Sequence, residues 1–131
     1  SLFPGAKELL DWLKGYGIQV AVVSTKLGQT IQRIFAYQRL EDQVGLILGG
    51  KDVRRAKPDR EGLNLAMERL GLTREQVLFC GDTVIDALAA KNAGVDFCAV
   101  LNGTTPAAAF SEYPHVHIAP DLLELRRWLE G

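Results

Sequence analysis

The sequence contains few of the features that mark membrane, nucleotide-binding or serine-hydrolase proteins. No run of apolar residues approaches the length of about 18 that a bilayer-spanning helix needs. Three motifs are missing: the Gly-x-Gly-x-x-Gly dinucleotide fingerprint, the complete Gly-x-x-x-x-Gly-Lys-Ser/Thr phosphate loop and the Gly-x-Ser-x-Gly elbow. These absences argue against a membrane span and against the three commonest nucleotide-binding and hydrolase signatures.

Charge of one sign is also missing, since the formal net charge is −1 over 131 residues. A surface for polyanions is therefore not indicated by the overall balance. The basic stretch 51–60 has no interleaved aromatic side chains of the kind that stack on bases. We expect one domain over residues 1–131, with neither nucleic acid nor a membrane as partner.

Cysteine is scarce. Cys80 and Cys98 are the only two cysteines, and both lie inside apolar runs that are typical of strands. Free cysteines are usually buried in such places, and disulfides are rare in reducing compartments. We expect two buried thiols in a cytoplasmic protein, with a disulfide between neighbouring strands as the alternative.

Short apolar runs alternate with segments of helical periodicity along the whole chain. Strict alternation of strands and helices predicts an α/β fold: a three-layer, Rossmann-like parallel sheet with helices on both faces. Strands are expected over 18–23, 46–48, 77–80, 97–101 and 116–118, and helices over 6–16, after residue 26, over 58–70, up to residue 94, near residue 107 and after residue 121.

Two acids follow the apolar run 77–80. Such a run suits a strand buried on both faces, which would deliver Asp82 to its carboxyl end. Asp86 lies in the first turn of the next helix, so both carboxylates can face one crevice and hold a divalent cation, Mg²⁺ above all. A capping box formed by Thr83 and Asp86 is the simpler explanation for Asp86, but it does not account for Asp82.

Two further polar clusters, Ser24-Thr25-Lys26 and Lys57-Pro58, lie where a strand ends or a helix begins. Carboxyl ends of parallel strands share one edge, so a hydroxyl, an ammonium group and a metal-holding acid pair can converge there. This combination suits a phosphoryl group, whose oxygens need donors and positive charge. Taken singly, Ser24 or Thr25 could cap the second helix, and Lys57 could belong to a solvated basic face.

Taken together and in this order, these segments resemble the haloacid dehalogenase superfamily, in particular its phosphoglycolate-phosphatase-like branch. The resemblance extends over essentially the whole chain. The segments that carry it are Leu2-Phe3-Pro4-Gly5, Val20-Ala21-Val22-Val23-Ser24-Thr25-Lys26, Ala56-Lys57-Pro58-Asp59 and Val77-Leu78-Phe79-Cys80-Gly81-Asp82-Thr83-Val84-Ile85-Asp86.

The resemblance implies a role for each matching residue in a Mg²⁺-dependent phosphatase acting on a small phosphorylated metabolite. Ser24 would hydrogen-bond the transferring phosphoryl group, and Lys57 would neutralise its developing charge. Asp82 would bind Mg²⁺, with Asp86 beside it, orienting Lys57 or a metal-bound water. The remaining substrate contacts implied are Thr25, Lys26 and Asn102.

The chain departs from the family in one respect. The family's nucleophile is the first aspartate of an Asp-x-Asp motif, but the aspartates here stand at positions 11, 42, 52, 59, 82, 86, 96 and 121, and no two are separated by a single residue. The resemblance therefore implies the C-terminal part of a catalytic core, beginning where the cap domain ends, with the nucleophile outside these residues and this chain inactive alone.

The absent segment has a structural consequence, because the family's nucleophile strand lies between the strand that ends at Ser24 and the strand that ends at Asp82. Without it, two apolar strands have open edges, which favours association. We expect the two strands to pair directly, to recruit a strand from another chain, or to be stabilised by a segment outside these residues.

Other functions compete with the phosphatase. A non-catalytic module that binds phosphate or Mg²⁺, or that pairs with another protein, is favoured by the absent nucleophile. A receiver-type signalling domain has its acids before its hydroxyl and lysine, the reverse of the order here. His115-x-His117 would place two imidazoles on one strand face, but a zinc site needs further ligands.

Overall fold

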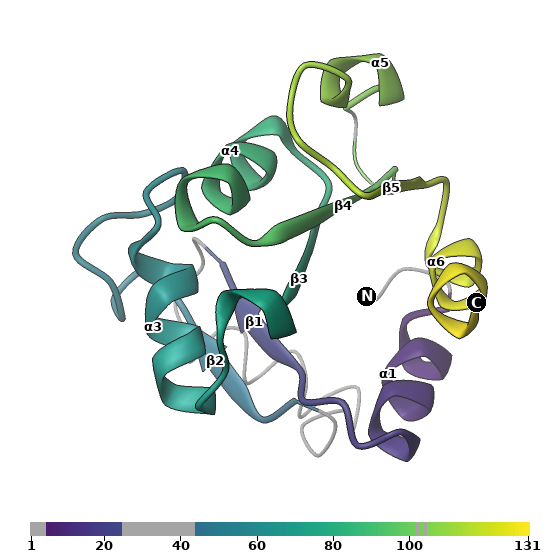
Figure 1. Ribbon diagram of the computed structural model, residues 1–131, viewed down its shortest axis with the longest axis horizontal. Helices are drawn as coiled ribbons and strands as arrows, with labels where there is room; N and C mark the ends of the chain where they lie inside the picture. Colours follow the sequence, from purple (N-terminus) through teal and green to yellow (C-terminus); the bar gives the residue numbers. More distant parts are fainter. Residues whose placement is uncertain (1–4, 25–43, 102, 104) are drawn as a thin grey trace.

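The computed structural model describes residues 5–24, 44–101, 103 and 105–131 (Figure 1). Helices and strands alternate along these ranges, and all strand pairs are parallel. The α/β class with a parallel sheet is thus confirmed. The elements are α1 (Ala6–Gly15), β1 (Ala21–Val23), β2 (Leu46–Leu48), α3 (Glu61–Leu70), the 3₁₀ turn η2 (Arg74–Gln76), β3 (Leu78–Gly81), α4 (Val84–Ala93), β4 (Asp96–Val100), α5 (Ala107–Phe110), β5 (His117–Ala119) and α6 (Leu122–Glu130).

The described strands form two separate groups. β1 pairs with β2, with Val22 opposite Ile47. β4 lies between β3 and β5, with Phe79 opposite Phe97 on one side. Direct pairing of β1 with β3, one of the three outcomes expected for these strands, is not adopted, because the two belong to different sheets.

The side chains of β4 alternate between two apolar clusters. Phe97 and Ala99 pack in a cluster with residues of α3, α4 and α5, whereas Cys98 and Val100 pack in a second cluster with residues of α1 and α6. Successive strand residues point to opposite faces, so this alternation means that both faces of the sheet are covered. Figure 1 shows α1 and α6 side by side, away from α3 and α4. The predicted three layers are therefore present.

The helices begin and end at the residue types that favour helix boundaries. The Asp121 carboxylate accepts the Glu124 N–H at 2.8 Å and so caps α6, as its sequence predicts. Gly71 and Gly94 follow α3 and α4 with φ of 67° and 75°, a conformation that glycine adopts at little cost. None of the helices in the described ranges could span a bilayer.

The predicted start of the third helix at Pro58 is wrong, because α3 begins at Glu61. Residues 57–60 form turns instead, and the peptide bond between Lys57 and Pro58 is cis. The Asp59 carboxylate accepts the N–H of Glu61 at 2.9 Å. Asp59 thus satisfies an N–H of the first helical turn. It does so from just before the helix, although the sequence predicted that Asp59 lies within it.

Strand ends also differ from expectation by one to three residues. The expected strand 18–23 is reduced to β1, although Val20 and Ser24 continue its hydrogen bonding to the β2 segment. The fourth and fifth strands are β4, one residue earlier than expected, and β5, one residue later. The helix expected after residue 26 lies outside the described residues.

Both cysteines are free, as expected, but only one is buried. Cys98 is fully enclosed, whereas Cys80, expected to be buried, is exposed. Cys80 belongs to β3, whose strand neighbour among the described residues is β4 alone. The exposure of Cys80 follows from the edge of β3 that no described strand covers.

Candidate active site

Lys57 is the centre of the site and is held by three partners. Its Nζ donates to a carboxylate oxygen of Asp86 at 2.6 Å and to the main-chain oxygen of Val23 at 3.2 Å. The same ammonium lies 5.5 Å from the centre of the Phe79 ring, within the range of a cation–π interaction. Because these partners come from β1, β3 and α4, the amine ties the two groups of strands together at their carboxyl ends.

Asp86 is an almost completely enclosed acid with both carboxylate oxygens engaged. One oxygen binds Lys57, and the side chains of this pair are only 14% and 9% exposed. The other oxygen accepts the Asp82 N–H at 3.2 Å, the Thr83 N–H at 3.3 Å and the Thr83 hydroxyl at 3.0 Å. The predicted capping box is therefore present, and the contact of Asp86 with Lys57 that the resemblance implies is present as well.

Gly81 allows Asp86 to occupy this position. A Cβ at Gly81 would lie 2.5–2.6 Å from the Asp86 side chain, closer than carbon atoms can approach. The absence of a side chain at the end of β3 thus lets the first turn of α4 fold back over the strand. The Gly-Asp pair after the apolar run is the sequence signal for this close approach, but the pattern alone gives Gly81 no role.

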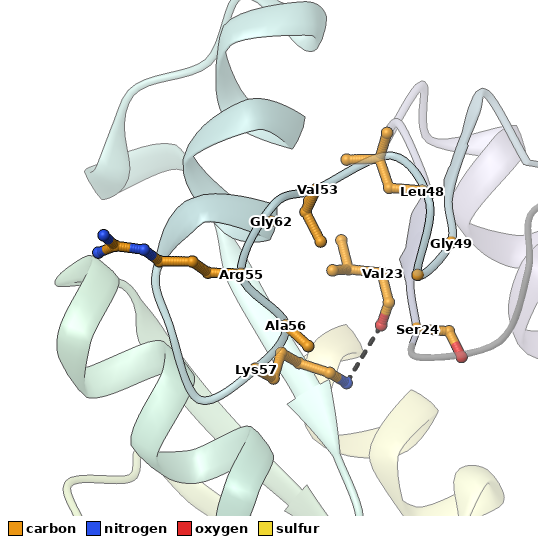
Figure 2. A pocket seen from close by; sticks show the side chains of 10 residues that line it. Val23, Ser24, Leu48, Gly49, Val53, Arg55, Ala56, Lys57 and Gly62 are labelled. Atoms are coloured by element: carbon orange, nitrogen blue, oxygen red, sulfur yellow. Dashed lines mark hydrogen bonds between the residues drawn. The ribbon is translucent and has the colours of Figure 1, made fainter.

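Ser24 lies directly after β1 and lines a small pocket together with Lys57 (Figure 2). The pocket has a volume of about 10 Å³, enough for about one water molecule. Gly49 and Gly50, at the end of β2, form another part of its wall. Ser24 and Lys57 thus line one pocket, whereas Asp82, predicted to converge with them, does not line it. Asp82 is connected to Lys57 through the hydrogen bond from its main-chain N–H to Asp86.

Asp82 supplies a carboxylate for which no described residue provides a hydrogen bond or an ion pair. Gly103, in the loop after β4, approaches it so closely that a Cβ there would lie 2.8 Å from an Asp82 carboxylate oxygen. One such carboxylate fits Mg²⁺, which is commonly bound through one or two carboxylates, with substrate phosphate and water completing the shell. Asp82 is therefore the described residue best placed to hold this ion.

Other candidate ligands are not assembled in the part of the chain that the structure describes. There, no three His, Cys, Asp or Glu side chains form a metal cluster. His115 contacts the Tyr113 main-chain oxygen, and His117 contacts Glu124 at 2.6 Å, so the two imidazoles have separate partners. Thr25, Lys26 and Asn102, named above as substrate contacts, lie outside the described residues, and their roles stay predictions.

Two residues that support Lys57 have no signal in the sequence. Phe79 contributes the ring beneath the ammonium group. Asn92 donates its side-chain amide to the main-chain oxygen of Pro58 at 2.8 Å, across 34 residues of sequence. Both contacts depend on tertiary packing: Phe79 lies within a segment that carries the resemblance, but nothing there indicated its contact with Lys57, and Asn92 belongs to no motif.

Known proteins resemble this chain in sequence and in fold. The sequence model for haloacid dehalogenase-like hydrolases matches residues 1–100. The chain belongs to this family. Among curated relatives, phosphoglycolate phosphatase 1 of Pseudomonas aeruginosa is 30% identical over 95% of this chain, and a phosphoglycolate phosphatase of Pseudomonas fluorescens is 32% identical over 78% of it.

Solved structures of the haloacid dehalogenase group share the fold. A haloacid dehalogenase superfamily hydrolase from Ehrlichia chaffeensis matches 98% of this chain with a TM-score of 0.83 and 26% identity, and the match covers 58% of that protein. A Bacteroides fragilis protein assigned to haloacid dehalogenase-like hydrolases matches 95% of this chain with a TM-score of 0.92 and 40% identity, covering 59% of that protein. The Rossmann-like class is therefore shown by neighbours as well as by topology.

The chain spans about half the length of the curated relatives it matches. The matched part is 46% of the Pseudomonas aeruginosa phosphatase and 38% of the Pseudomonas fluorescens phosphatase. The activity of a whole protein of that length therefore belongs to the proposal below.

Proposed function

We propose that these residues form the phosphate- and metal-binding part of a Mg²⁺-dependent phosphomonoester hydrolase of the phosphoglycolate phosphatase type. The observation that carries the proposal is the enclosed Lys57–Asp86 pair, which lies at the carboxyl ends of β1 and β3 beside Ser24 and Asp82. Named phosphoglycolate phosphatases among the relatives support the choice of reaction. The substrate class is a small phosphorylated metabolite.

In this proposal each side chain acts on one part of the phosphoryl group. Lys57 offers the N–H groups and positive charge that stabilise charge on phosphoryl oxygens, and Asp86 keeps its ammonium group in place. The Ser24 hydroxyl donates to another phosphoryl oxygen. Asp82 would hold Mg²⁺, which when bound supplies charge neutralisation for the phosphate. Because the Lys57–Asp86 pair is held in advance, little reorganisation is needed when substrate binds.

The nucleophile in this proposal is an aspartate outside these residues. It would stand at the end of a strand that runs between β1 and β3, facing Lys57. Its carboxylate oxygen would attack phosphorus, the ester P–O bond would break, and the alcohol would leave with a proton from the second acid of an Asp-x-Asp motif. Water would then hydrolyse the aspartyl-phosphate to phosphate and free aspartate. The 131-residue chain alone would lack this step.

The test is phosphate release by a joined polypeptide, in which an N-terminal segment that carries the Asp-x-Asp motif precedes these 131 residues. We expect Mg²⁺-dependent hydrolysis of small phosphate esters, lowered on the order of 100-fold by Lys57→Ala. Asp82→Asn should raise the Mg²⁺ concentration needed for half-maximal rate. The 131-residue chain should release no phosphate.

A folded joined polypeptide without metal-dependent turnover would contradict the enzyme. The alternative, a non-catalytic phosphate- or Mg²⁺-binding module or a protein-interaction module, would then be favoured. It draws its support from the absence of Asp-x-Asp in the sequence.

We also propose that the 131-residue chain, when alone, associates with itself through the edges of β1 and β3 that no described strand covers. The support is a contrast between two paired residues: Cys80 on β3 is exposed, whereas Cys98, opposite it on β4, is enclosed. Alkylation of Cys80 should slow as protein concentration rises, while Cys98 stays unreactive throughout. A concentration-independent rate for Cys80, together with a monomeric sedimentation coefficient, would contradict association. The two free thiols also support the proposed cytoplasmic location.

A further inference from the structure

Lys57 lies in the irregular segment between β2 and α3, where sheet hydrogen bonds do not fix the main chain. Side chains hold this segment instead. The Asp52 carboxylate accepts the Gly49 N–H at 2.6 Å, at the end nearer β2. The Glu61 carboxylate accepts the N–H groups of Arg54 and Arg55 at 2.8–2.9 Å. The Glu61 contacts span Lys57, and in the turn that follows Lys57 the Asp59 N–H donates to the Ala56 main-chain oxygen at 3.1 Å. All of these contacts lie within residues 49–61, so support of the turn from another element would add to them.

Asn92 provides that support from α4. Its amide donates to the main-chain oxygen of Pro58 at 2.8 Å, and Pro58 is the residue directly after Lys57. Asp86, the partner of the Lys57 ammonium, lies six residues earlier on the same helix, about 9 Å away along the axis. One helix therefore holds the Lys57 side chain at one point and the adjoining main chain at another.

We propose that Asn92 is a positioning residue for Lys57. Asn92 is exposed and does not line the pocket shared by Ser24 and Lys57, so we assign it no direct contact with substrate. It acts through the Pro58 carbonyl, which fixes the main chain from which the lysine side chain extends. Without this contact the ammonium group would still find Asp86, but over a wider range of positions. The proposal depends on the proposed function for its catalytic consequence, and its structural part stands independently.

Competitive acetylation with acetic anhydride, read by mass spectrometry, tests the structural part on the 131-residue chain. Lys57 should react slowly because its side chain is 14% exposed, whereas Lys7, which is 65% exposed, serves as the internal standard. Asn92→Ala should raise the rate at Lys57 relative to Lys7 about fivefold. The matched control is Asn64→Ala on α3, which makes the same exchange inside a helix and should leave the ratio unchanged. An equal ratio in the two variants would overturn the proposal.

Steady-state kinetics of the joined polypeptide test the catalytic part. Asn92→Ala should lower kcat about tenfold with little change in KM, because the charge of Lys57 is needed most as the phosphoryl group transfers, whereas Asn64→Ala should change neither constant. A kcat that is equal in the two variants would overturn the positioning role. If the joined polypeptide shows no Mg²⁺-dependent turnover at all, the proposed function fails, and the acetylation ratio still decides whether Asn92 fixes Lys57.

Discussion

β3 and β4 are neighbouring parallel strands of similar composition that are buried to very different extents. In β4 four of the five residues are buried, whereas none of the four residues of β3 is. Phe79 lies opposite Phe97, and Cys80 lies opposite Cys98, so the two strands can be compared pair by pair. The difference comes from the neighbours: among the strands that the structure describes, β4 has one on each edge, whereas β3 has one on a single edge.

The comparison indicates that β3 has the sequence of an interior strand but lies at the edge of the sheet formed by the described strands. Natural edge strands are usually protected by charges, proline or bulges, but Leu78-Phe79-Cys80-Gly81 has none of these. β1, with Ala21-Val22-Val23, has the same character, and its residues are only half-buried. Both strands therefore support the proposal that a further strand lies between them in a longer polypeptide.

The largest expected effect is the difference in stability loss between a phenylalanine of β4 and its neighbour on β3. Phe97→Ala should lower the free energy of unfolding by about 3–5 kcal/mol, because Phe97 is 2% exposed and central to the α3–α4 cluster. Phe79→Ala should cost about 1–2 kcal/mol, because Phe79 is only half-buried. Urea unfolding followed by circular dichroism measures both. Equal losses would mean that the two strands are packed equally well, contrary to the comparison.

A smaller effect is expected at the carboxyl end of β3, the part of that strand that is tightly packed. Gly81→Ala should cost about 1–3 kcal/mol, because the new Cβ would displace the Asp86 side chain. Gly15→Ala is the control, since a Cβ at Gly15 meets no atom within 4 Å and alanine favours a helix. Urea midpoints of the two variants should therefore move in opposite directions. A Gly81→Ala protein as stable as the parent would contradict the close approach.

The smallest effect concerns pH and the segment that follows β2. Hydrogen bonds from the N–H groups of Arg54 and Arg55 lower the pKa of Glu61 from its ordinary value of 4.5. Glu61 therefore contributes stability above about pH 4.5, and this contribution is lost as pH falls through the lower pKa of the folded state. Urea midpoints between pH 3 and 6 should show a shallower acid loss in Glu61→Gln than in the parent. Parallel curves would contradict this contribution.

Much of the fold could be predicted because local signals agree with tertiary packing. Leu46–Leu48 and the capping of α6 by Asp121 follow from apolar runs and cap residues, and the structure has both. At Pro58 a local helix-start signal was misleading, because α3 begins three residues later at Glu61, whose N–H is accepted by the Asp59 carboxylate. Cys80 was misassigned for another reason: the sequence of a strand does not state how many neighbours it has.

In the candidate site, too, contacts with a local sequence signal were predictable and contacts that depend only on tertiary packing were not. The meeting of Lys57 with Asp86 was accessible from the sequence, because both residues lie at predicted element ends and the resemblance links them. The contact of Asn92 with Pro58 was not accessible, because it joins two exposed positions that share no periodicity or motif. Contacts of this kind depend on how a helix and a turn are placed in space.

Hydrogen exchange on the joined polypeptide tests the central claim most directly, namely that one added strand completes the sheet between β1 and β3. Relative to the 131-residue chain, amides within Ala21–Val23 and Leu78–Gly81 should exchange at least about tenfold more slowly, while those of β4 change little. Unchanged exchange at β1 and β3 in a joined polypeptide that is folded would contradict the claim.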